Sequence, residues 1–211
     1  MARYTGAVCR MCRREGIKLF LKGQRCLTDK CAIDNRNFVP GEHGKSHYRR
    51  RQLLGYGQQL REKQKVKRMY GVLENQFRRY FRKAETTKGV TGEILLQLLE
   101  RRLDNITFRL GFSTSRAQAR QFVLHGHILV NGKRVNIPSY QVKKGDEISI
   151  LLKSRKNPLI LSAVEGVAGK GFPEWLTLDR ENLTGQVVEL PNREAITVPI
   201  EESLIVELYS K

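Results

Sequence analysis

The chain has 211 residues, 40% of them hydrophobic, and its 39 Lys and Arg residues against 21 Asp and Glu residues give a formal net charge of +18. This length and composition suit one or two domains with real cores and exclude a disordered tail, and no apolar run approaches the roughly 18 residues that a membrane span needs. The charge predicts a polyanionic partner, and the aromatic residues among the basic ones favour nucleic acid over a membrane surface.

Four cysteines lie within the first 31 residues with the spacing C-x2-C-x13-C-x4-C. A C-x2-C turn presents two thiolates to one tetrahedral ion and a second short pair closes the shell, so the spacing predicts one structural zinc ion with no open position for catalysis. An iron–sulfur cluster needs the same ligands and stays an alternative, as do two disulfides, which a reducing cytosol opposes. The predicted metal ligands are Cys9, Cys12, Cys26 and Cys31.

Residues 32–57 show neither helical nor strand periodicity and contain Pro40, Gly41 and a run of three arginines, Arg49, Arg50 and Arg51. A loop of this length is usually functional or ordered by a partner, and basic arms commonly fold on binding RNA. We therefore expect a basic arm that contacts nucleic acid, with a solvated linker as the alternative.

Three helices are predicted in the next 50 residues. Residues 58–70 combine apolar and charged positions and end at Gly71, and an apolar stripe from Val72 to Phe81 follows, which is more typical of core than of base stacking. Thr91 and Glu93 indicate the start of a third helix, which we expect to end near residues 104–105.

A capped basic helix is predicted next. Ser115 and Gln118 form a capping box, in which side-chain atoms satisfy backbone donors at a helix start, and Gly126 supplies a left-handed stop. Arg116 and Arg120 are four residues apart and share a face, so we expect one face of this helix to be basic.

A small antiparallel sheet should follow this helix. Asn131-Gly132 between two alternating apolar stretches is the strongest two-residue hairpin pattern, and it places Lys133 and Arg134 at the hairpin tip. Two more strands are expected around residues 175–190 across a turn at Gly185, and Pro199 is expected to open a last helix. Several glycines between residues 157 and 175 weaken any helix there.

These patterns carry a resemblance. The stretch R-L-D-N-I-x-F-R-L-G-F, then S-R-x-x-A-R-Q, then G-H-I-x-V-N-G-x-x-V-x-I-P-S-Y-x-V-x-x-G-D resembles the RNA-binding module named after the fourth protein of the small ribosomal subunit. That module also occurs in pseudouridine synthases and tyrosyl-tRNA synthetases, so the flanks decide between families. The flanks Y-G-x-Q-L-R-E-K-Q-K-V-K-R-M-Y-G, T-G-E-x-L-L-x-L-L-E and L-I-V-E-L-Y-S-K are similar to the bacterial family of small-subunit ribosomal protein number four, in its four-cysteine zinc-binding form.

The resemblance implies an α+β fold. Its parts would be an N-terminal zinc-binding segment with a basic loop at residues 1–45, and a helical domain at 46–95 completed by a C-terminal helix at 197–211. An inserted RNA-binding domain at 96–196 would pack helices on a small, mainly antiparallel sheet, with the RNA-binding module at about 99–163.

The resemblance further implies a structural constituent of the small ribosomal subunit, a primary rRNA-binding protein that binds the 5′ domain and nucleates assembly near the mRNA entrance, with a bearing on translational accuracy. Its partners would be small-subunit rRNA, neighbouring small-subunit ribosomal proteins and, as a further candidate, mRNA, with no membrane and no small-molecule substrate. A cytoplasmic location is expected, since the N-terminus lacks the apolar stretch of a signal peptide.

RNA would be bound by neutralising phosphates, with two domains reading the shape of a folded RNA. Residues 1–85 hold 22 basic and 7 acidic side chains, whereas residues 156–211 hold 5 and 9, so the RNA-facing surface should come from the first three quarters of the chain. The expected contacts are Arg49, Arg50, Arg51, Lys63, Lys65, Lys67, Arg109, Arg116, Arg120, Lys133 and Arg134.

Rival functions are weaker. An RNA-modifying or RNA-charging enzyme would need a catalytic domain for which the chain has no spare residues, and no nucleotide-binding glycine loop is present. A zinc-finger transcription factor would need a long recognition helix beside the metal, where this chain has Pro40, Gly41 and Gly44. A free RNA-binding translational regulator would use the same surface and stays an alternative.

Overall fold

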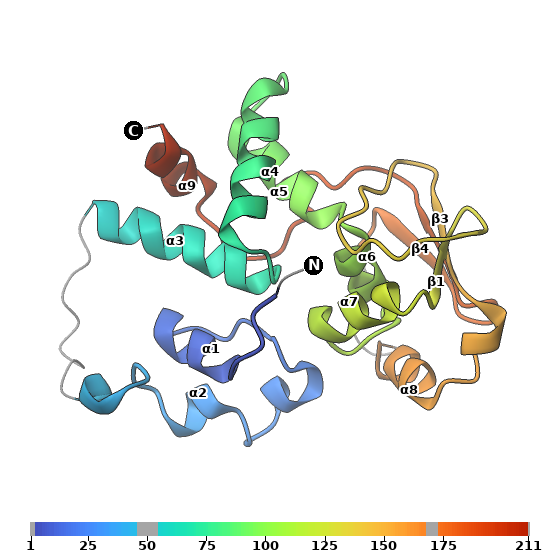
Figure 1. Cartoon of the computed structure of the whole chain (residues 1–211), viewed down its shortest axis with the longest axis horizontal. Coiled ribbons are helices and arrows are strands. Elements are labelled where there is room, and N and C mark those ends of the chain that lie inside the picture. Colours follow the sequence, from blue (N-terminus) through green and yellow to red (C-terminus); the bar gives the residue numbers. More distant parts are fainter. Residues whose placement is uncertain (1–2, 46–54, 168–172, 211) are drawn as a thin grey trace. The chain divides into compact units, whose positions relative to one another are not determined.

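The computed structural model describes residues 3–45, 55–167 and 173–210 and divides the chain into two compact units (Figure 1). Unit 1 comprises Met1–Gly92 and Val198–Lys211, and unit 2 comprises Glu93–Thr197. Helices are accompanied by one antiparallel sheet, so the predicted α+β class is confirmed.

Unit 1 starts with short helices. Helix α1 (Cys9–Glu15) ends at Gly16, whose positive φ of 73° lets its N–H donate to the carbonyl of Cys12. A 3-10 turn η1 (Gly23–Leu27), helix α2 (Ala32–Asn35) and a second 3-10 turn η2 (Glu42–Gly44) follow. The prediction that residues 32–57 lack regular structure is therefore wrong for α2 and η2. The three arginines at 49–51 lie outside the described residues.

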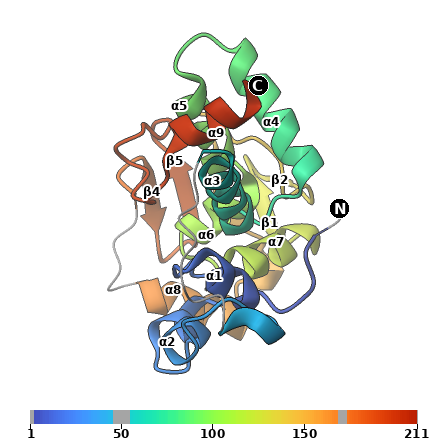
Figure 2. The same ribbon diagram turned by 90° about the vertical axis from the view of Figure 1, so that its left-hand side faces the viewer.

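Three longer helices lie in the described remainder of unit 1. They are α3 (Tyr56–Met69), α4 (Glu74–Thr86) and α9 (Glu202–Tyr209), and α9 packs on α3 although the two are far apart in sequence (Figure 2). Phe77 and Phe81 are buried, which confirms that the aromatic stripe is core, and the ring of Tyr209 stacks on Phe81 at 4.4 Å between centroids. The last helix begins at Glu202, so the prediction that Pro199 opens it is wrong by three residues.

Unit 2 contains helix α5 (Thr91–Glu100) over most of its length, then α6 (Leu103–Arg109), α7 (Arg116–Leu124), the 3-10 turn η4 (Leu152–Ser154) and α8 (Pro158–Val167). The single helix predicted from Thr91 to about residue 105 is in fact two. Arg102 is extended and bridges to Gln141, and the N–H of Leu103 donates to the carbonyl of Tyr140, so tertiary pairing ends α5 before α6 begins.

The sheet has the strand order β2-β1-β3-β5-β4 and is antiparallel throughout. Its strands are β1 (Ile128–Val130), β2 (Lys133–Arg134), β3 (Glu147–Ile150), β4 (Leu176–Asp179) and β5 (Thr184–Val187). Ile128 pairs with Ile150 and Val130 with Ile148, which puts these four side chains on the face that joins α6, α7 and α8 in one apolar core. Asn131 and Gly132 have φ of 49° and 74°, as the predicted two-residue hairpin requires.

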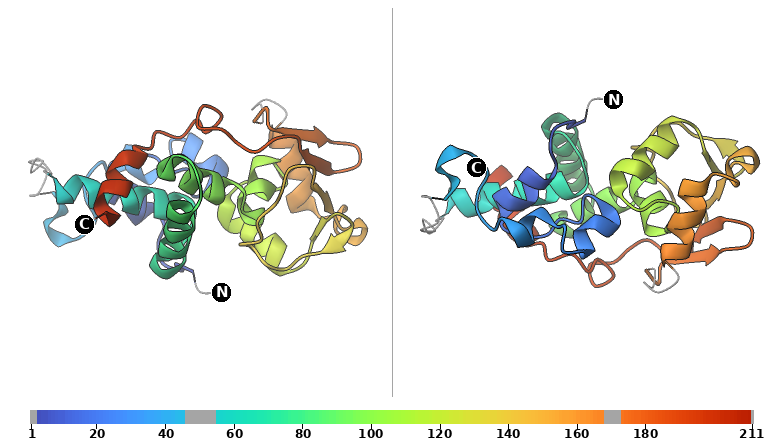
Figure 3. Two further views of the ribbon diagram at one scale, coloured as in Figure 1. Left: turned by 90° about the horizontal axis from the view of Figure 1, so that it is seen from above. Right: turned by 90° about the horizontal axis from the view of Figure 1, so that it is seen from below.

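The β4–β5 hairpin corrects a further expectation (Figure 3). Gly185 is not in the turn; it lies inside β5 opposite Leu178, and the turn is capped by Asp179, which accepts hydrogen bonds from the N–H groups of Glu181 and Asn182. A Cβ at Gly185 would stand 2.5 Å from the Cδ2 of Leu110, so the missing side chain lets the α6 region pack against the strand.

Candidate RNA interface

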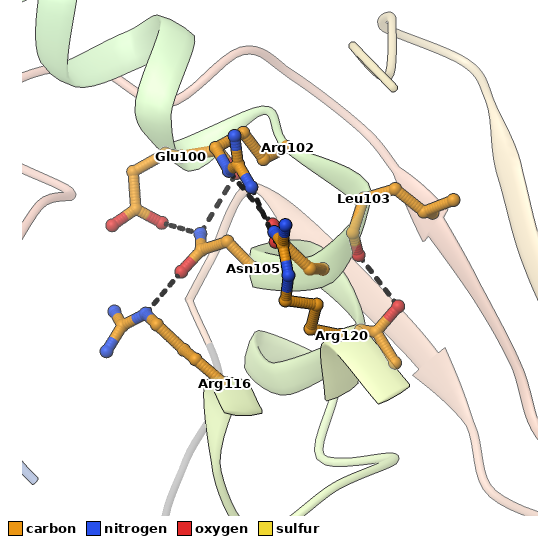
Figure 4. Close-up of polar contacts among 8 residues, drawn as sticks. Glu100, Arg102, Leu103, Asn105, Arg116 and Arg120 are labelled. Atoms are coloured by element: carbon orange, nitrogen blue, oxygen red, sulfur yellow. Dashed lines mark hydrogen bonds and ion pairs between the residues drawn. The ribbon is translucent and has the colours of Figure 1, made fainter. Parts of the chain in front are cut away.

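Helices α6 and α7 are joined by buried charges (Figure 4). The carboxylate of Asp104 accepts hydrogen bonds from Nε of Arg102 at 3.0 Å, from Nη2 of Arg102 at 2.6 Å and from Nη1 of Arg120 at 3.1 Å. Arg102 is fully buried and the other two side chains nearly so. One carboxylate thus holds two guanidinium groups in the core, where an unpaired charge would be costly.

A second polar cluster lies beside the first. Glu100, the last residue of α5, is 1% exposed and accepts hydrogen bonds from Nδ2 of Asn105 at 2.6 Å and from Nη2 of Arg109 at 2.6 Å. The Oδ1 of Asn105 in turn accepts from Nε of Arg116 at 2.8 Å, and the guanidinium of Arg116 lies 4.7 Å from the ring centroid of Phe108. Helix α7 is fixed against α6 by both clusters.

The two clusters distinguish three of the arginines that were predicted to contact RNA. Arg120 is buried and belongs to the core, whereas Arg109 and Arg116 are partly exposed and are oriented by Glu100 and Asn105. The start of α7 is as predicted, because the N–H of Gln118 donates to the Oγ of Ser115 at 3.3 Å. The reciprocal bond differs, since the Gln118 side chain accepts from the N–H of Thr114 and not of Ser115.

The β1–β2 hairpin presents two exposed cations, Lys133 and Arg134. Nη2 of Arg134 donates to the carbonyl of His125 at 2.9 Å, and a Cβ at Gly126 would stand 1.9 Å from Nε of Arg134, so the glycine after α7 makes room for this guanidinium. Burial lowers the pKa of nearby His127, and the charges of His125 and Arg134 act in the same direction.

The three lysines predicted on α3 all have carboxylate partners inside unit 1. The Nζ atoms of Lys63 and Lys67 donate to Oε1 and Oε2 of Glu74 at 2.8 and 2.9 Å. The Nζ of Lys65 lies 2.7 Å from Oε1 of Glu62. Burial opposes ionisation of Glu74, but the hydrogen bonds from the two lysines lower its pKa to about 2. These lysines therefore form ion pairs within unit 1, and their predicted contacts with RNA stay a prediction.

Four cations on the outer face of α4 were left out of the predicted contacts and are exposed. They are Arg78, Arg79, Arg82 and Lys83. They are three and four residues apart on the side of α4 opposite the buried Phe77 and Phe81. This helical periodicity predicts an exposed basic face from the sequence alone.

The cysteines lie in the N-terminal part of unit 1. Cys12, Cys26 and Cys31 are buried, Cys9 is half-buried, and none of the four is in a disulfide. The N–H of Lys22 donates to the Sγ of Cys26 at 3.4 Å. Burial raises the pKa of the Cys12 thiol; a backbone hydrogen bond at Leu19 opposes this, and the other three cysteines add to it. In the described part of the chain, no three histidine, cysteine or acidic side chains are gathered in an arrangement that could hold a metal ion.

Comparison with known proteins gives the family. Residues 3–100 match the ribosomal protein S4/S9 N-terminal domain and residues 101–148 match the S4 domain. Small ribosomal subunit protein uS4 of Natranaerobius thermophilus is 63% identical over 211 residues, which are 100% of both chains. The chain belongs to the uS4 family. The uS4 proteins of Acidobacterium capsulatum and Citrifermentans bemidjiense are 61% and 60% identical over the same full length.

Membership of the uS4 family confirms the predicted family and the prediction of a structural protein that is not an enzyme, while the four-cysteine zinc-binding form stays a prediction. The S4 domain covers α6, α7, the β1–β2 hairpin and the start of β3. These elements carry the exposed hairpin cations and the two polar clusters, apart from Glu100, which ends α5 just before the domain. Among the described helices, none is long and apolar enough to cross a membrane.

Proposed function

We propose that this chain is a structural constituent of the small ribosomal subunit that binds small-subunit rRNA with the surface formed by α7 and the β1–β2 hairpin. The observation that carries the proposal is the full-length match to uS4 proteins, with the S4 domain falling on the elements that present Arg116, Lys133 and Arg134. As a ribosomal protein it works in the cytoplasm, beside neighbouring small-subunit proteins.

Binding follows from charge placed on a rigid support. Cations that meet phosphates release condensed counterions, so affinity falls as salt rises, and partly exposed or exposed side chains can do this without breaking the core. Arg116, Lys133 and Arg134 meet that condition, whereas Arg120 is bound to Asp104 in the core. The A-form shape of folded RNA, and not a base sequence, is what such a surface recognises.

The finer role rests on the resemblance of the whole chain to the family. It is that of a primary binder of the 5′ domain of small-subunit rRNA, which nucleates assembly and lies near the mRNA entrance, with mRNA as a further partner. Sedimentation of the native protein with small subunits, and protection of the 5′ domain from hydroxyl radicals by the purified protein, test this role. If the native protein instead bound its own mRNA and did not sediment with small subunits, the alternative of a free translational regulator would be favoured.

Salt titration tests the surface directly. Replacing both Lys133 and Arg134 with Ala should weaken binding to a 5′-domain rRNA fragment and lower the slope of log affinity against log salt by about 1 to 2, about one for each phosphate that is no longer neutralised. Arg180→Ala removes an exposed cation of the acidic C-terminal part and serves as the control. Equal slopes for the double variant and the unsubstituted protein would remove the hairpin from the interface.

We also propose that Cys9, Cys12, Cys26 and Cys31 hold one structural zinc ion. The support is their spacing and the chemistry of the set: four thiols, three of them buried and none in a disulfide. Bound zinc would crosslink α1, η1 and the start of α2. Elemental analysis should give about one zinc per chain and less in Cys12→Ser. Bound iron would favour an iron–sulfur cluster instead of zinc, and folded protein without any metal would refute both metal sites.

A further inference from the structure

We infer that Glu100 is a positioning residue, which sets the orientation of the Arg116 guanidinium at the RNA surface through the side-chain amide of Asn105. The inference rests on the proposed function for the role of Arg116, and on the second polar cluster for the relay itself. Glu100, Asn105 and Arg116 are the labelled side chains at the left of Figure 4, with the amide of Asn105 between the carboxylate and the guanidinium.

The chemistry of the three groups makes the relay directional. An ionised carboxylate only accepts hydrogen bonds, a guanidinium only donates them, and an amide has one end of each kind. Nδ2 of Asn105 donates both to Oε2 of Glu100 at 2.6 Å and to the backbone carbonyl of Glu100 at 3.0 Å. Both amide hydrogens are therefore directed at Glu100, which leaves Oδ1 to face Nε of Arg116 at 2.8 Å.

Arg116 is restrained on two sides. Its Nε is bound to Asn105, and the Cζ of its guanidinium lies 4.7 Å from the ring centroid of Phe108. A planar fork that is already oriented loses less freedom when it pairs with a phosphate. Glu100 is 1% exposed and Arg116 is partly exposed, so a buried carboxylate helps to orient a surface cation through the amide of Asn105.

Arg109 pairs with the same carboxylate of Glu100. It donates to Oε2 of Glu100 from Nε at 3.1 Å and to Oε1 from Nη2 at 2.6 Å, a bidentate pair. In Glu100→Gln, the new side-chain NH2 would face the NH2 of Asn105, and two donors would repel. The Asn105 amide would then rotate by about 180° and present Nδ2 to the Nε of Arg116. Two donors would then face each other, and the restraint on Arg116 would be lost.

A double-mutant cycle on the full chain tests the relay. Affinity for a 5′-domain rRNA fragment is measured for the unsubstituted protein, Glu100→Gln, Arg116→Ala and the double variant. Glu100→Gln should weaken binding roughly threefold to tenfold alone, the expected cost of freeing one long side chain, and should have little further effect once Arg116 is absent. Equal losses in both backgrounds would show a general structural role and overturn the relay.

Asn105→Leu is the second variant, should Glu100→Gln fail to fold. It has a similar shape, leaves the Glu100–Arg109 pair in place and removes the bond to Nε of Arg116, so it should show the same coupling to Arg116→Ala. The Nε–H proton of Arg116, observed by NMR in the RNA-free protein, should exchange slowly and lose this protection in either variant. Unchanged exchange refutes the relay by itself, while an unsubstituted protein that does not bind the fragment refutes the proposed function and with it the role of Arg116.

Discussion

Asp104→Asn should strongly destabilise unit 2, because Asp104 is the carboxylate that pairs with Arg102 and Arg120 in the core. The substitution changes size very little and removes one negative charge. Two guanidinium groups, one fully buried and one nearly so, would then share a neutral amide with a single acceptor oxygen.

The expected loss is about 3–5 kcal/mol, the usual cost of removing one partner from a buried ion pair. A urea dependence of about 2 kcal/mol per molar converts this to a midpoint about 1.5–2.5 M lower. Trp175, the one tryptophan of the chain, lies in the core of unit 2, so its fluorescence follows the unfolding of that unit. The assay is urea denaturation of the unsubstituted and variant proteins at neutral pH.

Glu189→Gln is the matched control in the same unit. Its pair with Lys144 spans 3.5 Å, and both side chains are about two-thirds exposed, at 67% and 65%. Exposed pairs contribute only about 0–1 kcal/mol, so this variant should unfold near the unsubstituted midpoint. If Asp104→Asn shifted the midpoint no more than Glu189→Gln does, the carboxylate charge would not be what holds the two arginines, and the reasoning on the buried cluster would be refuted.

Three further variants test separate features of the fold. The folded pKa of Glu74 is lowered to about 2, below its unfolded value of 4.5. Its ionised form therefore stabilises the fold fully above pH 4.5, and this stabilisation is lost as the pH falls through about 2. In Glu74→Gln, the loss of helical circular dichroism between about pH 4.5 and 2 should be smaller. An unchanged acid transition would contradict this. Gly185→Ala should cost about 1–3 kcal/mol through its clash with Leu110, and Leu110→Val in the same chain should recover part of the loss in the urea midpoint. Ser115→Ala should cost about 1 kcal/mol by the same assay, and no change would exclude its capping role.

Local patterns predicted the elements whose causes are local. The hairpin at Asn131-Gly132 and the helix start at Ser115 depend on the conformations and side chains of a few adjacent residues, and both are present. Gly185 is different: a larger residue there would clash with the side chain of Leu110, which lies 75 residues earlier in the chain. The division between α5 and α6 likewise depends on the pairing of Arg102 with Gln141, which no local pattern encodes.

The candidate site divides in the same way. A helical period of 3.6 correctly puts Arg116 and Arg120 on neighbouring positions of α7, but it cannot tell which of them meets a buried carboxylate. Asp104 and Glu100 make that distinction, and they come from α6 and α5. The sequence shows the number of charges, whereas only the packing shows which charges are already paired. The zinc ligands and individual RNA contacts remain predictions.

The packing of α9 on α3 has a consequence for synthesis of the protein. Gln59 donates to Glu207 and the N–H of Glu201 donates to Glu62, hydrogen bonds that span 148 and 139 residues. At roughly 5–20 residues per second, α3 would wait on the order of 10 seconds for its partner, while all of unit 2 is translated in between. The whole of unit 2 therefore leaves the ribosome before unit 1 can close. A nascent chain that stopped short of Ile205 would expose the buried surface of helices made long before.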